Sequence, residues 1–234
     1  MTWQRLTVVF VIAVILALPI TAPLAAGLAA AGPSRLTATD VRGSIWGGEL
    51  RQAALGPFTL GDVKAGMDPL SLLTGRPKAR IEARGEALKG HGWVRLGRGA
   101  PGIEDFSASV PLSAFGVNAP LSGELTLTKV TAGFRAGVCA PASGEIAATL
   151  QGVGGAAIPL KGRPGCQGRA LVLPLTGSRD GARVDLVFRL EASGRYQTEA
   201  KIQTSDPMLS AILAAEGFTC AAGECGKANE GRLS

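Results

Sequence analysis

The sequence has few of the residues from which catalytic and metal sites are built. It contains one histidine, one tyrosine and three tryptophans among its 234 residues. The histidine, His91, stands between Gly90 and Gly92, and a lone histidine in such a setting usually faces solvent without an acid–base partner. A Cys-x-x-Cys pair, a Gly-x-Ser-x-Gly nucleophile elbow and a Gly-Lys-Ser/Thr phosphate loop are also missing from the sequence. These absences predict a non-enzymatic protein with no catalytic residues, no cofactor and no metal site.

Basic residues form no continuous stripe, although the formal net charge is +6. Arg5 contributes one of these charges, which leaves +5 on residues 35–234. A nucleic-acid-binding surface needs clustered basic residues with interleaved aromatics, and aromatics make up only 5% of the chain. The basic residues instead alternate with apolar ones, as at Lys78, Arg80 and Arg84. We therefore predict a solvated strand face and no nucleic-acid partner, with a weak attraction to anionic lipid headgroups left open.

The N-terminal part of the sequence carries no charge over residues 6–34. About 20 apolar helical residues cross the hydrocarbon layer of a bilayer, so residues 6–28 are long enough for a transmembrane anchor. Residues 1–5 then form a cytoplasmic N-terminus, because Arg5 precedes the apolar run, and residues 29–34 form a linker. This organisation predicts a single-pass protein of the bacterial inner membrane with the rest of the chain in the periplasm.

The same segment also has features of a cleaved signal peptide. Small-residue sites occur at Ala25-Ala26-Gly27 and Ala29-Ala30-Ala31, and Pro19 and Pro23 interrupt a helix. The uncharged run is longer than the usual apolar region and cleavage site together, which favours the uncleaved anchor. Under either interpretation, residues 35–234 are exported from the cytoplasm.

The four cysteines, an even number in an exported chain, predict two disulfides with three possible pairings. Cys220 and Cys225 flank a short glycine-containing segment, which favours a local pair and leaves Cys139 with Cys166. A metal site or a redox dithiol is disfavoured, because no Cys-x-x-Cys motif occurs and the histidine is distant in sequence.

Alternation of apolar and polar residues recurs through residues 35–225. In the clearest case, residues 183–191, four apolar side chains alternate with mostly charged ones: Val184, Leu186, Phe188 and Leu190. Such alternation places one strand face in a core and the other in water. Breaks that contain Gly, Pro, Asn or Asp separate these segments at hairpin-like intervals. The sequence therefore predicts a mainly β fold, in which residues 35–225 form a periplasmic domain with a largely antiparallel, twisted sheet.

Two or three short helices are expected to interrupt the sheet. Residues 68–75 read Asp-Pro-Leu-Ser-Leu-Leu-Thr-Gly, with an N-capping Asp, a Pro at the first helical position and a terminating Gly. Residues 206–217 repeat this pattern at greater length, and residues 110–116 form a shorter version. The last segment, residues 226–234, is polar and predicts a flexible tail.

Several segments, taken together, resemble type II secretion system protein N. Residues 41–48 read Val-Arg-Gly-Ser-Ile-Trp-Gly-Gly and resemble the Gly-Ser/Thr-Leu-Trp-x-Gly element of that family. Residues 67–75 resemble its Pro-x-x-Leu-Leu-x-Gly-like helix, although Met67 and Asp68 replace the usual aromatic before it. Residues 119–127 resemble its proline and Ser-Gly-Glu-Leu element, and residues 194–218 its late Gly-Arg-Tyr strand and helix. The residues that carry the resemblance are Gly43, Trp46, Gly48, Pro69, Leu72, Leu73, Gly75, Pro120, Gly123, Leu125, Gly194 and Tyr196.

The resemblance implies a non-enzymatic accessory or scaffold component of the inner membrane, within the apparatus that moves folded proteins from the periplasm across the outer membrane. Its partners would be other components of the type II secretion system, and the lipid bilayer through the N-terminal helix. The family is also similar to AsmA-like proteins, which implies a taco- or barrel-like sheet and an alternative function as a groove that binds or transfers lipid. We further expect the Trp46 side chain to pack in the core and hold the first strand against it. An unpaired strand edge near residues 121–127 is the expected partner contact.

Overall fold

The computed structural model describes residues 23–24, 36–55, 58–86, 88–97, 100–112, 122–151 and 157–232. The predicted anchor lies outside these residues except for Pro23 and Leu24, and the predicted linker at residues 29–34 lies wholly outside them. Within this part of the chain, no helix is long and apolar enough to cross a membrane.

Sixteen strands form one continuous sheet. Consecutive strands are neighbours from β3 to β10 and again from β12 to β14, and every pairing is antiparallel. The prediction of a mainly β, largely antiparallel fold is confirmed. The strands are β1 (Leu36–Thr37), β2 (Asp40–Ser44), β3 (Gly47–Leu55), β4 (Phe58–Met67), β5 (Lys78–Arg84), β6 (Lys89–Arg95), β7 (Gly102–Pro111), β8 (Ser122–Arg135), β9 (Val138–Gln151), β10 (Ala157–Gly162), β11 (Gly165–Gln167), β12 (Ala170–Arg179), β13 (Ala182–Leu190), β14 (Arg195–Gln203), β15 (Thr219–Ala221) and β16 (Glu224–Arg232).

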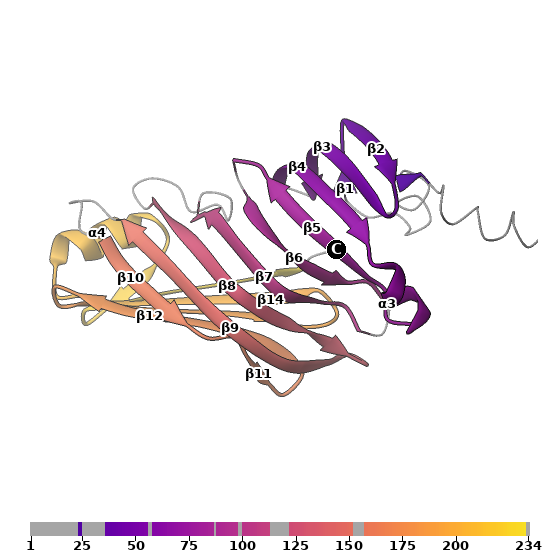
Figure 1. Ribbon diagram of the computed structural model, residues 1–234. Coiled ribbons are helices and arrows are strands. Elements are labelled where there is room, and N and C mark those ends of the chain that lie inside the picture. Colours follow the sequence, from indigo (N-terminus) through magenta and orange to yellow (C-terminus); the bar gives the residue numbers. More distant parts are fainter. Residues whose placement is uncertain are drawn as a thin grey trace, which may run out of the picture.

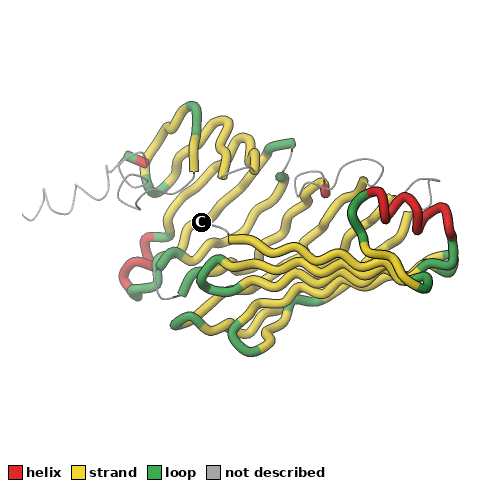
Figure 2. Tube along the Cα trace, turned by 180° about the vertical axis from the view of Figure 1, so that it is seen from behind, coloured by secondary structure: helices red, strands yellow, loops and turns green. Residues whose placement is uncertain are grey.

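The sheet curls back on itself, so that two walls overlap in both views (Figures 1 and 2). Strands β4 to β9 form one wall, and strands β12, β13, β14 and β16 form the other. The side chains on the concave face of this curl form the buried core, as described below. The path of the sheet does not close into a ring among the described strands, because β1 and β15 stand at its two ends.

Because the strands are antiparallel, their ends alternate between two ends of the sheet (Figure 1). Strands β2, β4, β6, β8, β10, β13 and β16 finish at one end, which carries helix α3 (Pro69–Leu73) and is called the α3 end below. Strands β3, β5, β7, β9, β12 and β14 finish at the opposite end, which carries helix α4 (Pro207–Ala215) and is called the α4 end. The two predicted helices are therefore confirmed. Residues 113–116 of the third predicted helix lie outside the described residues, and β7 extends to Pro111.

Helix α4 begins and ends with the chemistry that its sequence predicts. The Asp206 carboxylate accepts hydrogen bonds from the backbone N–H groups of Met208 and Leu209, at 2.8 and 3.4 Å. At the other end, the N–H of Phe218 donates to the carbonyl of Leu213 at 3.0 Å, and Gly217 adopts φ +82°. This is a Schellman ending, in which a left-handed glycine stops the helix and satisfies its last carbonyls.

Two buried clusters fill the curl of the C-terminal strands. Near the α4 end, Leu213 of α4 is 1% exposed and packs against Leu160 and Val184 of the sheet. The second cluster joins β8 and β9 to β12 across the curl, through Phe134, Ile146 and Leu171 among others. A third cluster, in the N-terminal strands, is built from smaller residues and is described below.

Two predictions about the sheet are corrected by the structure. Residues 226–232 do not form a flexible tail, because they belong to β16, which pairs with β14 along its whole length. Residues 122–127 are not an unpaired edge, because β8 lies between β7 and β9 in the middle of the sheet. In both cases the pairing partner decides the state of the strand, and the partner is distant in sequence.

Candidate functional site

The N-terminal strands carry an open hollow of about 660 Å³ beside the β2–β3 turn. Trp46 lies in this two-residue turn, which joins Ser44 to Gly47. The backbone N–H of Met67 donates to the carbonyl of Ile45 at 2.8 Å, so the turn closes onto the end of β4. The apolar lining comes from Trp46, Met67, Pro69 and Trp93, and the charged lining from Arg42, Glu49, Lys64, Asp68, Arg80 and Glu82.

Trp46 is half-buried in the wall of this hollow and belongs to none of the three buried clusters. A Cβ atom at Gly66 would lie 2.5 Å from the Trp46 carbonyl oxygen, so a side chain at that position would push the turn away from β4. An open hollow with charges of both signs differs from an enclosed small-molecule site, which is mostly apolar and concave. Its tryptophans, Met67 and arginines are of the residue types that are enriched at protein contacts.

The second tryptophan of the hollow, Trp93, is held by charged neighbours. The ammonium group of Lys78 lies 5.4 Å from the centre of its ring, within the range of a cation–π contact. Lys78 and Arg95 both pair with the Glu104 carboxylate, at 3.6 and 3.4 Å. Sequence reasoning missed Trp93, because only the strand register brings it opposite Arg80 and beside Glu104.

The concave face of the C-terminal strands is apolar and only partly covered at the α3 end. Leu173, Phe188, Leu190 and Tyr196 are half-buried there. The rings of Phe188 and Tyr196 stack with their centres 5.9 Å apart. The Tyr196 ring also lies over Gly231, where a Cβ atom would meet its hydroxyl oxygen at 2.6 Å. Near the α4 end, helix α4 covers the same face through Leu209 and Leu213.

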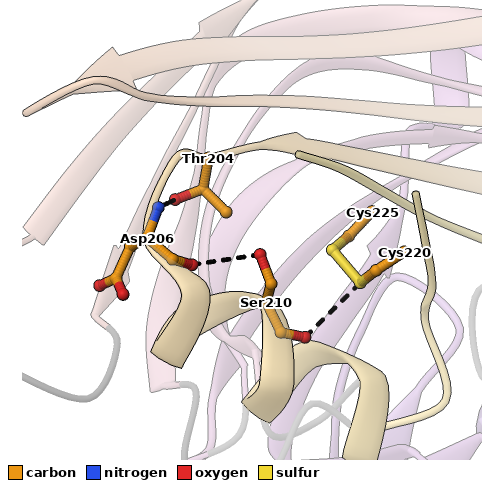
Figure 3. Close-up of a disulfide and its surroundings, with 5 residues drawn as sticks. All are labelled: Thr204, Asp206, Ser210, Cys220 and Cys225. Carbon is orange, nitrogen blue, oxygen red and sulfur yellow. Dashed lines mark hydrogen bonds between the residues drawn. A yellow bond between two sulfur atoms is a disulfide. The ribbon is translucent and has the colours of Figure 1, made fainter. Parts of the chain in front are cut away.

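One disulfide, Cys220–Cys225, joins β15 to β16 beside helix α4 (Figure 3). Cys225 is fully buried, and the Cys220 sulfur lies 3.6 Å from the carbonyl oxygen of Ser210 on α4. A disulfide sulfur carries no hydrogen, so this is a packing contact. The Ser210 hydroxyl donates to the carbonyl of Asp206 at 3.1 Å in the first turn of the helix. The disulfide therefore fixes the short hairpin that supports α4.

The other disulfide, Cys139–Cys166, joins β9 to the short strand β11, and their positions are 27 residues apart in sequence. Cys139 packs against the cluster of Phe134 and Leu171, so the bond clamps the curl where the two walls meet. The cysteines are paired as their sequence spacing favours, and free cysteines are absent from the described chain.

The residues that carry the family resemblance have three kinds of structural position. Gly43 and Gly48 face each other in the β2–β3 hairpin beside Trp46. Pro69 starts α3 and Gly75 follows it with φ +67°, whereas Leu72 and Leu73 of the same helix are exposed. Pro120 lies outside the described residues. The others lie in the sheet and its turns: Gly123 and Leu125 in β8, Gly194 in the β13–β14 turn with φ +81°, and Tyr196 in β14.

No catalytic arrangement surrounds His91 in the described part of the chain. His91 is exposed and lies between Glu82 and Ser107 in the register of the sheet. The Glu82 carboxylate accepts hydrogen bonds from Arg84 at 2.6 and 2.8 Å, and these bonds and the Arg84 charge hold its pKa below the ordinary value. Over the same residues, no group of three His, Cys, Asp or Glu side chains is placed to hold a metal ion.

Comparison with known protein families matches residues 34–225 to the family described as type II secretion system (T2SS), protein N. The match begins before β1 and extends into β16, so it spans almost the whole described sheet. The corresponding comparisons with curated proteins and with solved structures give no match.

Proposed function

The chain belongs to the family of type II secretion system protein N, and we propose that it acts as a non-enzymatic accessory or scaffold component of that system. In this proposal residues 6–28 anchor the chain in the inner membrane and the β domain lies in the periplasm, where it contacts other components of the apparatus. The observation that carries the proposal is the match over residues 34–225. A component that works by binding needs exposed surfaces, and the described chain offers two candidates for a protein partner: the Trp46 hollow and the outer edge of one long strand.

The strand edge belongs to β16. Strand β15 pairs with β16 only as far as Gly226, and beyond it no second neighbour of β16 is present among the described strands. The turn residues Ala222 and Gly223 both have positive φ, so Ala221 and Glu224 form the closing hydrogen-bonded pair of a two-residue hairpin. Every second N–H from Glu224 onward, including that of Ala228, then points away from β14. A partner strand could add to this edge by main-chain hydrogen bonds.

The test of the proposal is a strain that lacks the gene, assayed for a secreted hydrolase in the periplasm and in the medium. We expect the hydrolase to accumulate in the periplasm and the full-length gene to restore its secretion. Normal secretion in the deletion strain would overturn the proposal.

The edge of β16 is tested by Ala228→Pro, which removes one outward-facing N–H, against Ala228→Val, which adds similar bulk and keeps the donor. Restoration by the valine variant alone would support a partner strand on β16, whereas equal restoration by both would exclude this edge.

A second candidate function is a lipid-binding face, and the half-buried apolar side chains at the α3 end of the curl favour it. Leu173, Phe188 and Leu190 present apolar surface there without a covering helix. Against it, the buried alanines Ala108 and Ala148 belong to a close-packed interior. Native mass spectrometry of the detergent-extracted chain distinguishes a lipid-binding face from a close-packed interior. A lipid-binding face predicts a stoichiometric phospholipid, and its absence would leave the scaffold function alone.

A further inference from the structure

Charged residues are distributed unequally between the two ends of the sheet. The comparison covers the described turns and the strand residues next to them. The α3 end has two acidic residues, Asp68 and Glu191, against eight basic ones: Arg76, Lys78, Arg95, Arg135, Arg163, Arg169, Arg195 and Arg232. The α4 end has three basic residues, Arg84, Lys89 and Arg179, against five acidic ones: Glu86, Asp180, Asp206, Glu216 and Glu224. The domain therefore has one basic end and one weakly acidic end.

Most of the arginines at the α3 end are exposed and lack an acidic partner in the described chain. Lys78 and Arg95 pair with Glu104, and Arg163 lies 3.9 Å from Glu145. The remaining five make no ion pair with a described residue: Arg76, Arg135, Arg169, Arg195 and Arg232.

Two of these arginines face each other directly. Arg195 of β14 and Arg232 of β16 are register partners on neighbouring strands, and like charges in that arrangement destabilise a sheet. Both also line an open hollow of about 510 Å³ beside Tyr196, together with Arg189, Glu191 and Glu230. An external anion would relieve the repulsion between Arg195 and Arg232, and this end as a whole carries an excess of positive charge.

Exposed apolar side chains gather at the same end. On helix α3, Leu70 is 70% exposed and Leu73 is 85% exposed, and Leu72 is also exposed. Leu96, which follows β6, and Val138, the first residue of β9, are also exposed. A single exposed leucine needs no explanation, but at the α4 end Met208 is the one large apolar side chain found exposed among the described residues. Leucines among exposed arginines match the amphipathic composition of an interfacial membrane contact.

The N-terminal segment identifies the partner. Residues 6–22 are uncharged, and the described chain resumes at Pro23, which forms a bridge with Ser44. Ser44 ends β2 at the α3 end, beside the Trp46 turn. Leu24 then packs in the cluster of Leu50. Pro23, the residue that follows this uncharged sequence, therefore lies at the end of the sheet that carries the arginines and the exposed leucines.

We propose that the α3 end rests on the surface of an anionic phospholipid bilayer. The arginines contact lipid phosphates, and Leu70 and Leu73 enter the interfacial layer, in addition to any attachment through residues 6–28. An acidic protein surface would explain the arginines but would leave the leucines of α3 in water. The contact is independent of the secretion role and places the open end of the curl against the membrane.

The first test compares two exposed positions in the full-length chain, reconstituted in vesicles of phosphatidylcholine mixed with phosphatidylglycerol. A photoreactive benzoylphenylalanine replaces Leu73 at the α3 end or Met208 at the α4 end, because both side chains are mostly exposed. We expect covalent phospholipid adducts at position 73 and few at position 208. Equal labelling at the two positions, or adducts at position 73 to protein only, would overturn the proposal, and the second result would indicate contact with another copy of the chain.

The second test removes charge. Arg135→Gln and Arg195→Gln should each lower the yield of lipid adducts at position 73 by about fivefold, since a basic residue near an anionic surface contributes about 1 kcal/mol. Arg179→Gln makes the same charge change at the α4 end and should leave the yield unaltered. Vesicles of phosphatidylcholine alone should reproduce the low yield. If the yield is the same with all three variants and in both lipids, the arginines do not hold the domain on the membrane.

Discussion

The N-terminal strands β2 to β6 and the C-terminal strands β8 to β16 pack in different ways. The N-terminal cluster is wholly aliphatic and draws only on its own strands and their connections, together with Leu24: its buried members are Leu24, Leu50, Ala53, Val63 and Ala83. The C-terminal clusters join two walls of the curl and helix α4 through larger side chains such as Phe134 and Leu213. Both disulfides belong to the C-terminal part. The comparison indicates that the C-terminal part supplies most of the stability, whereas the N-terminal part keeps its faces open for contacts.

The sharpest way to test this comparison is to truncate one buried leucine in each part. Leu213→Ala should cost about 4 kcal/mol in the free energy of unfolding, because Leu213 is 1% exposed and enclosed by both the sheet and α4. Leu50→Ala should cost about 2 kcal/mol, near the low end for such a change, because its small neighbours can close around the gap. Denaturant unfolding measures both, with exposed Leu73→Ala as the control. A larger loss for Leu50→Ala would reverse the comparison.

The disulfides allow a second comparison, within the C-terminal part. Removal of Cys139–Cys166 by a double change to Ser should cost about 3.5 kcal/mol, because that bond closes a long loop of the unfolded chain. Removal of Cys220–Cys225 should cost about 2 kcal/mol, because its loop is short. Unfolding of the two double variants in denaturant, beside the parent chain, gives both values. Equal losses of stability would show that packing around the sulfurs, rather than the entropy of the unfolded chain, determines how much each disulfide stabilises the fold.

Close backbone approach occurs in both parts, at Gly162 and Gly177 in the C-terminal strands and at Gly61 in the N-terminal strands. Gly61 in β4 has φ +74°, and a Cβ atom there would lie 2.3 Å from the Cα of Gly85. Gly61→Ala should therefore cost about 2 kcal/mol or more, from the strained φ and from the displaced backbone. Gly47→Ala is the matched control, since its Cβ would meet nothing within 4 Å and its φ is not in the left-handed region. Thermal unfolding of both variants checks this, and a neutral Gly61→Ala would mean that β4 and β5 can separate without loss.

Local sequence patterns predicted much of this structure. The alternation at residues 183–191 predicted a strand correctly, because one face of β13 packs against the core through Val184, Leu186 and Leu190. The Asp-Pro starts of α3 and α4 were correct because capping depends on residues within one turn of each helix. The spacing of the cysteines favoured the pairing that the structure has, since Cys220 and Cys225 face each other across a short hairpin.

The errors concern features that depend on distant partners. Residues 226–232 are polar and lack strand-like alternation, yet they form β16 because β14 provides a template for hydrogen bonds. β8 is central because β7 and β9 flank it, and no feature within residues 121–127 shows this. The clustering of arginines at the α3 end could not be predicted from the sequence for the same reason. They are scattered from residue 76 to residue 232, and only the order of the strands brings them to one end.

The smallest expected effect is on the stability of the fold in acid, and it differs between the N-terminal and the C-terminal strands. Hydrogen bonds from Lys201 and then Arg189 hold the pKa of Glu199 below its ordinary value, and the Glu82 pKa is lowered by Arg84. A lowered folded-state pKa stabilises the fold above the unfolded value, near 4.5, and this contribution is lost as the pH falls through the folded pKa. Arg84 is two positions from Glu82, and Lys201 is two positions from Glu199, so both basic residues stay near their carboxylates in the unfolded chain and those parts of the shifts partly persist on unfolding.

Arg189 reaches Glu199 from the neighbouring strand at 3.3 Å and is lost as a partner on unfolding. Glu199→Gln should therefore flatten the loss of stability between about pH 5 and 3 by less than about 1 kcal/mol, since the pair is exposed. Glu82→Gln should change that slope less. Unfolding curves collected across this pH range measure both slopes, with the parent chain as reference. A steeper change for Glu82→Gln would mean that contacts within one strand, rather than between strands, control the acid sensitivity of the sheet.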